Sequence, residues 1–128
     1  MVSSSDPRDV VRAYYEAMSA RDAAAVLVLF TDDAVSEDVP YGVPVGRLRL
    51  SQTLPAFFDA YPSLRYACRR LLMDGETVVA EYEVTNPHAG EGWRMRGVAI
   101  FEVRAGRIAR HTAYWDEKTF RQGLKNAE

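Results

Sequence analysis

The second half of the sequence is the feature that most limits the fold. Four segments of alternating apolar and polar residues follow one another there, and such alternation is typical of half-buried β-strands. Asp74-Gly75 and Ala105-Gly106 are tight-turn signals, so each joins two of these segments into a hairpin. The expected strands are 64–73, 77–85, 93–104 and 107–116, with a loop at 86–92. This pattern predicts a largely antiparallel sheet.

The first half of the sequence predicts helices. Ser5-Asp6-Pro7 offers a capping residue followed by proline, and apolar residues then recur at helical spacing as far as Met18. We expect a first helix that ends at Arg21-Asp22, a second at 23–30, and a third from about Arg47 or Ser51 to Tyr61. Residues 34–38 predict a short strand or extended segment, and the prolines and glycines of 40–46 predict a loop.

Helices followed by antiparallel strands predict an α+β fold with the helices on one face of a curved sheet. The 128 residues suit a single domain, 1–128, and the open end of a strongly curved sheet is a natural ligand site. The net charge is −2, and the 16 basic and 18 acidic residues are spread along the chain, which argues against a nucleic-acid partner. No signal peptide or apolar run long enough for a membrane span is present, so we expect a cytoplasmic protein without a membrane partner.

Two strings carry a resemblance to a known superfamily. They are VVRAYYEAMSARDAAAVLVLFTDDAVSED in the helical half and RIARHTAYWD in the last strand. Together with the element order, they make nearly the whole chain resemble the nuclear transport factor 2-like (NTF2-like) superfamily, most closely ketosteroid isomerases and SnoaL-like polyketide cyclases. The resemblance implies a cystatin-like cone, in which an antiparallel or mixed sheet wraps over three N-terminal helices. This fold hosts enzymes, binding modules and scaffold proteins alike.

The resemblance also implies an active site. Ketosteroid isomerases carry a helical Tyr that donates a hydrogen bond to the substrate oxyanion and an Asp that acts as general base. Tyr14 and Asp38 stand at the matching positions, and Trp115 matches an aromatic residue that packs against the ligand. Two positions where relatives carry polar catalytic residues are Ala99 and Ala113 here. Their small side chains imply a larger cavity, which suits a bulky polyketide, terpenoid or steroid.

Further candidates come from strand and helix faces. His111 shares a strand face with Ala113 and Trp115, so it is either an acid or base of the site or a structural histidine. Tyr82 is expected to face inward, whereas Glu81 and Glu83 are expected to face solvent or a subunit interface and to pair with Arg94 and Arg96. Tyr14 and Tyr15 are adjacent on a helix, so only Tyr14 is expected to face the core. The remaining candidates for the pocket wall are Phe30, Tyr41 and Phe58.

These candidates predict a cofactor-independent acid–base enzyme acting on an apolar small molecule. Asp38 would serve as general base or acid and Tyr14 as oxyanion donor, in an isomerisation, a cyclisation or an epoxide opening. The sequence shows no metal-ligand spacing, phosphate loop or nucleophile elbow, so we expect neither metal nor cofactor. The alternative is a non-catalytic small-molecule-binding or dimerisation module. Relatives commonly form homodimers through the outer sheet face, and we expect the same here.

Overall fold

A computed structural model of the chain describes residues 5–90 and 92–124 and confirms the α+β class. The elements are α1 (Pro7–Ala20), α2 (Ala23–Leu27), β1 (Phe30–Asp38), β2 (Val45–Gly46), α3 (Arg47–Ala60), β3 (Arg65–Asp74), β4 (Thr77–Thr85), the short 3₁₀ helix η1 (Pro87–Ala89), β5 (Arg94–Arg104), β6 (Arg107–Tyr114) and α4 (Glu117–Leu124). Among the described residues, no helix is long and apolar enough to cross a membrane.

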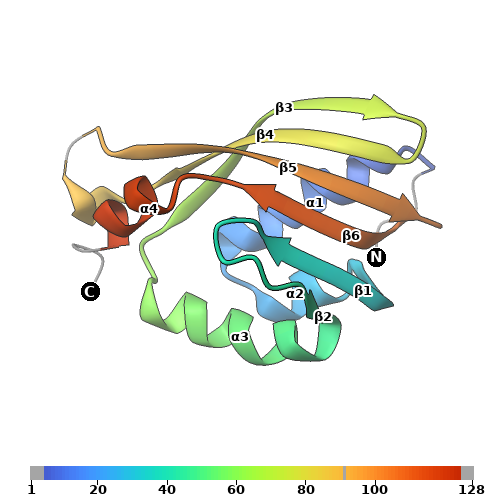
Figure 1. Cartoon of the computed structure of the whole chain (residues 1–128), viewed down its shortest axis with the longest axis horizontal. Helices are drawn as coiled ribbons and strands as arrows, with labels where there is room; N and C mark the ends of the chain where they lie inside the picture. The colour runs from blue at the N-terminus through green and yellow to red at the C-terminus, as the bar shows by residue number, and fades with distance from the viewer. Residues whose placement is uncertain (1–4, 91, 125–128) are drawn as a thin grey trace.

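The strands form one curved, mixed sheet in the order β2-β1-β6-β5-β4-β3 (Figure 1). Strands β3 to β6 pair antiparallel with their neighbours in the chain, as the hairpin signals predict. Strand β1 instead runs parallel to β6, with Ser36 opposite His111 and Asp38 opposite Ala113. This parallel pairing brings residues from the first third of the chain beside residues from the last strand.

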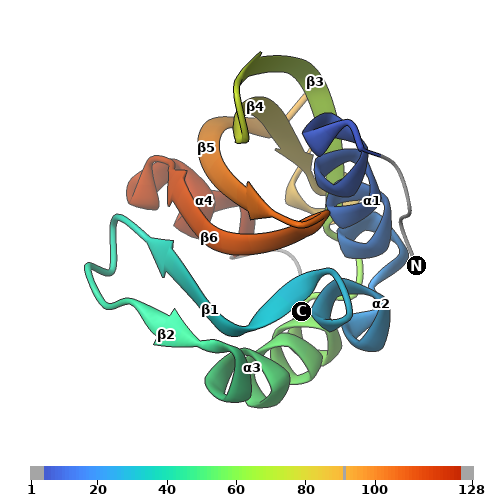
Figure 2. The same ribbon diagram turned by 90° about the vertical axis from the view of Figure 1, so that its right-hand side faces the viewer.

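Helices α1, α2 and α3 cover the inner side of the curved sheet (Figure 2). Helix α1 begins at Asp6, whose side chain accepts a hydrogen bond of 2.9 Å from the Arg8 backbone N–H. It packs against β3 and β4, whereas α3 packs against β1 and α2. These two helices lie against opposite ends of the sheet (Figure 2). Residues of both helices and of the sheet line a cavity between them.

Several boundaries differ from the sequence prediction. The last strand ends at Tyr114 rather than at residue 116, and the predicted loop 40–46 contains the two-residue strand β2. The second helix ends at Leu27 rather than at residue 30, and Phe30 and Thr31 already belong to β1. The reason is long-range pairing, because Phe30 aligns with Ile108 of β6 and the Ile108 N–H donates to the Leu29 carbonyl at 2.7 Å. Helix α4 follows the last strand and was not predicted from the sequence. Asp116, just before this helix, accepts a 2.9 Å hydrogen bond from the Thr119 N–H.

Candidate active site

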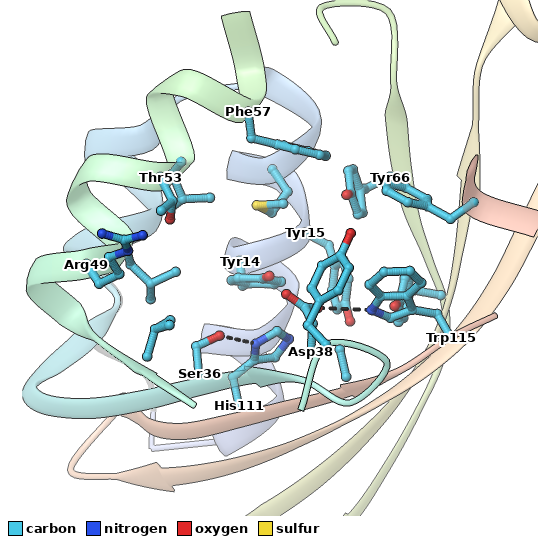
Figure 3. A pocket seen from close by; sticks show the side chains of 18 of the residues that line it. Tyr14, Tyr15, Ser36, Asp38, Arg49, Thr53, Phe57, Tyr66, His111 and Trp115 are labelled. Carbon is cyan, nitrogen blue, oxygen red and sulfur yellow. Dashed lines mark hydrogen bonds between the residues drawn. The ribbon is translucent and has the colours of Figure 1, made fainter. Parts of the chain in front are cut away.

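A cavity of about 470 Å³ opens between α1, α3 and the inner face of the sheet (Figure 3). This volume lies within the range of small-molecule sites. Its wall is mainly aromatic and aliphatic, with few polar groups: Tyr14, Tyr15, Met18, Ser36, Asp38, Tyr41, Val43, Val45, Arg49, Leu50, Thr53, Leu54, Phe57, Tyr66, Tyr82, Met95, His111, Ala113, Trp115 and Phe120. The composition suits a largely apolar ligand with a small number of oriented polar atoms.

Asp38 is the carboxylate in this wall. It is the last residue of β1, and its Oδ1 accepts a 3.0 Å hydrogen bond from Nε1 of Trp115 (Figure 3). Burial raises the pKa of Asp38 because it removes water from the charged form, and the Trp115 hydrogen bond opposes this only in part. No cation forms an ion pair with Asp38 in the described part of the chain. The group therefore favours proton uptake more than an ordinary aspartate does.

Tyr14 and Tyr15 of α1 both line the cavity and are both buried. The expectation that only one of them could face the core was wrong. The curved sheet bends around α1 and therefore covers two adjacent positions of the helix, so that Tyr15 stacks on Tyr82 with ring centroids 5.5 Å apart. The Tyr14 ring meets Phe101 edge-on at 5.3 Å. Burial is the main cause that raises the pKa of both phenols, so both stay protonated and can donate hydrogen bonds.

Ser36 and His111 form a second polar pair in the wall. Ser36 Oγ lies 2.9 Å from Nδ1 of His111, and both side chains are buried (Figure 3). Burial lowers the pKa of His111 to about 4, because an imidazolium would lose its hydration there. The imidazole is therefore neutral near pH 7.

The other predicted wall residues divide into two groups. Trp115, Tyr82, Tyr41 and Ala113 line the cavity, and the Tyr41 ring meets Trp115 edge-on at 5.2 Å. Phe30, Phe58 and Ala99 do not line it, because all three are enclosed in the hydrophobic core. Ala99 is fully buried between Ala80 and Ala113 on the neighbouring strands, so its methyl group does not reach the cavity.

Several wall residues were not predicted from the sequence. Phe57 takes the place expected for Phe58, because helix α3 turns the face of Leu50, Leu54 and Phe57 toward the cavity. Their helical spacing was a signal that could have found Phe57. Ser36 lies two residues before Asp38 on the same strand face, so strand alternation could have found it as well. No local signal marks Tyr66, Arg49 or Thr53 as wall residues.

The described residues contain no cluster of side chains suited to bind a metal ion. Within residues 5–90 and 92–124, no group of three or more His, Cys, Asp or Glu side chains is arranged to hold a metal ion. The polar groups that line the cavity are phenol, carboxyl, imidazole, hydroxyl, indole and guanidinium groups. Such groups can donate hydrogen bonds and transfer protons.

The curved sheet, the helices on its inner side and the cavity between them define an NTF2-like protein. The sequence model of the SnoaL-like domain matches residues 11–111, and the chain belongs to this family. Among curated proteins, none matches the sequence.

Solved structures share the fold along most of their length. A candidate polyketide cyclase from Xanthomonas campestris pv. campestris is 28% identical, with a TM-score of 0.72 over 92% of this chain and 96% of its own. A candidate ketosteroid isomerase from Kribbella flavida is 24% identical, with a TM-score of 0.71 over 87% and 78%. An LEH-like epoxide hydrolase from Mycobacterium tuberculosis is 23% identical, with a TM-score of 0.69 over 94% and 90%. The last two likenesses concern the fold alone.

Proposed function

We propose that this protein is a cofactor-independent acid–base enzyme that acts on an apolar small molecule. Asp38 removes or delivers a proton, and the Tyr14 hydroxyl donates a hydrogen bond to the substrate oxygen that gains negative charge. The observation that carries the proposal is the Asp38 carboxyl group, which lies in an apolar cavity with the Trp115 N–H as its hydrogen-bond donor. Perturbed carboxyl groups in a concave apolar site are typical of acid–base catalysts.

Three reactions are compatible with this pair of groups. Double-bond isomerisation, ring closure and epoxide opening each move a proton while an oxygen atom gains charge. The solved structures with the same fold include a candidate cyclase, a candidate isomerase and an epoxide hydrolase, which supports these three reactions. We propose a substrate of the polyketide, terpenoid or steroid class. The exposed Arg49 and Thr53 on the α3 side of the cavity favour a substrate with an oxygen acceptor at that end.

The test is turnover by Asp38→Asn, which keeps the shape and removes the transferable proton. Candidate substrates are a β,γ-unsaturated ketosteroid, a terpenoid epoxide and a linear polyketide ester that can cyclise. For any of these that the wild type converts, kcat of Asp38→Asn should fall by about 100-fold or more. The matched control is Asp32→Asn, because Asp32 lies on the same strand with an exposed side chain. Equal rates in wild type and Asp38→Asn would contradict the assignment.

A non-catalytic binding module is the second candidate function. The feature that favours it is alanine at positions 99 and 113, where the family resemblance implies polar catalytic residues. In that case the wild type binds a steroid or polyketide in the cavity without converting it. Asp38→Asn would then bind the same ligand with unchanged affinity, as measured by isothermal titration calorimetry.

We also propose that the protein is a cytoplasmic homodimer that associates through the outer sheet face. Exposed apolar side chains on that face support the dimer, notably Val98 and Tyr114, which lie opposite each other on β5 and β6. Light scattering should give twice the chain mass, and Val98→Glu should reduce it to the mass of one chain. A single-chain mass for the wild type at micromolar concentration would exclude this dimer.

A further inference from the structure

Ser36 and His111 form a buried polar pair to which the proposed proton transfer assigns no task. They come from distant parts of the chain and meet because β1 and β6 pair in parallel, with Ser36 opposite His111. Ser36 Oγ and His111 Nδ1 are 2.9 Å apart, and both residues contribute to the cavity wall (Figure 3). Buried polar side chains that also face a ligand site are candidates for contact with the ligand.

The surroundings of His111 keep its ring uncharged. The rings of Phe101 and Tyr14 lie 4.8 and 5.2 Å from it, centroid to centroid, and Phe30 meets it edge-on. No carboxylate forms an ion pair with His111 in the described ranges. Burial holds its pKa at about 4, so His111 is a weak base and carries no acidic imidazolium proton at neutral pH. A neutral imidazole still has one N–H donor and one acceptor nitrogen.

The hydrogen bond to Ser36 decides which nitrogen carries the proton. In the described part of the chain, His111 Nδ1 is the hydrogen-bond partner of the buried Ser36 hydroxyl. If Ser36 donates to Nδ1, the hydroxyl proton is satisfied and the ring proton must be on Nε2. If Nδ1–H donated to Ser36 instead, the hydroxyl proton would need another acceptor, and a buried unsatisfied donor costs about 1–3 kcal/mol. The first arrangement is therefore favoured.

We propose that Ser36 fixes His111 in the neutral Nε2–H tautomer, and that His111 donates this N–H to the same substrate oxygen that Tyr14 binds. Ser36 is then a positioning residue, and His111 is a hydrogen-bond donor rather than a base. This inference rests on the proposed acid–base function for its oxyanion. It adds a second hydrogen-bond donor beside Tyr14, whose ring centroid lies 5.2 Å from that of His111. Loss of one such donor typically lowers kcat by about 100- to 1000-fold.

The tautomer can be measured without knowing the substrate. In long-range ¹H–¹⁵N spectra of the ¹⁵N-labelled wild type at pH 7, Nδ1 of His111 should have the shift of an unprotonated nitrogen and Nε2 that of a protonated one. In Ser36→Ala the two tautomers should mix, and Ser36→Thr, which keeps a hydroxyl, should restore the wild-type pattern. A protonated Nδ1 in the wild type, or an imidazolium at pH 6, would overturn the inference.

The donor role has its own readout with 2-naphthol, whose ionisation is visible by fluorescence. Bound naphthol should ionise at lower pH in the wild type than in His111→Phe, and Ser36→Ala should lie between them. Thr112→Val, on the opposite face of β6, should match the wild type. Identical naphthol ionisation in wild type and His111→Phe would overturn the donor role. These results do not involve Asp38 turnover, so the failure of either proposal can be recognised separately.

Discussion

The indole N–H of Trp115 donates a 3.0 Å hydrogen bond to the carboxylate of Asp38. The two residues are far apart in the chain and meet because β1 lies beside β6. The bond stabilises the charged carboxylate, whereas burial stabilises the protonated acid, and the raised pKa of Asp38 shows that burial is the stronger effect. Trp115 therefore tunes the proton affinity of Asp38 as well as forming part of the wall.

Replacing Trp115 by Phe should raise the pKa of Asp38 further, because the carboxylate loses its N–H donor. If Asp38 is a general base, the acidic limb of kcat/KM against pH moves to higher pH. Carboxyl ¹³C titration reports the same shift without a substrate. Tyr114→Phe is the matched control, because Tyr114 is the preceding residue and is exposed. An unchanged Asp38 titration in Trp115→Phe would show that the hydrogen bond has no effect on proton affinity.

Asp38→Asn should stabilise the protein at pH 7 although it lowers kcat. The folded-state pKa of Asp38 is raised, so the native state binds more protons than the unfolded state above the unfolded pKa, and stability falls as pH rises through that window. A neutral amide lacks this penalty. We expect a gain of about 0.5–2 kcal/mol in the free energy of unfolding at pH 7, in the range of stabilising substitutions. The gain should shrink as the pH falls toward the unfolded pKa. Urea unfolding at several pH values measures it.

Gly97→Ala should disturb the cavity wall. An added Cβ would lie 2.5 Å from Cζ of Tyr82, whose ring covers Gly97 on the neighbouring strand. The Tyr82 ring stacks on Tyr15 and on Tyr66, so we expect an added methyl group at position 97 to push this ring toward the cavity. We expect a loss of about 1–3 kcal/mol in the free energy of unfolding and weaker binding of apolar ligands.

Gly46→Ala is the matched control for this substitution, because a Cβ at Gly46 meets nothing within 4 Å. Both variants can be compared by urea unfolding and by ligand titration. If the two were equally stable and bound ligand equally well, the close approach of Tyr82 to Gly97 would have no energetic meaning.

Glu83→Gln should destabilise the sheet far more than Glu81→Gln. The Glu83 side chain is only 5% exposed, accepts a 3.0 Å hydrogen bond from Arg69, and lies within 4 Å of Arg94 and Arg96. The Arg69 hydrogen bond is the main cause that lowers the pKa of Glu83. Glu81 has one 3.9 Å pair with Arg70 and a side chain that is 47% exposed.

The lowered pKa of Glu83 determines how its contribution to protein stability depends on pH. The Glu83 contribution is present above the unfolded-state pKa and is lost as pH falls through the folded-state pKa. The melting temperature of Glu83→Gln should therefore approach that of the wild type in acid and fall well below it at pH 7. A constant difference from pH 7 to pH 3 would contradict an electrostatic origin.

Local pattern was sufficient for the parts of the fold that depend on neighbours in the chain. Strand β4 has the predicted bounds, Thr77–Thr85, because alternation and the Asp74-Gly75 turn are both local. The family resemblance predicted that Tyr14, Asp38 and Trp115 would lie in one site, and all three line the cavity although they are far apart in the sequence. Their catalytic roles remain predictions.

Features that depend on long-range contacts could not be predicted from local sequence patterns. Phe30 looked helical until its pairing with Ile108 placed it in a strand. Glu83 is on the outer face as expected, but the arginines of two neighbouring strands cover it and exclude water. Tyr15 faces inward because of the curvature of the sheet, which no single segment of sequence encodes.

The hydroxyl of Tyr15 has a consequence for how this protein would evolve under selection for stability alone. Within the described residues, it is the one fully buried side-chain polar atom without a hydrogen-bond partner. An orphan of this kind costs about 1–3 kcal/mol, and phenylalanine would keep the ring and remove the cost. A laboratory lineage selected only for heat resistance should therefore replace this tyrosine early, whereas a lineage selected for ligand turnover would retain it if the phenol meets the ligand.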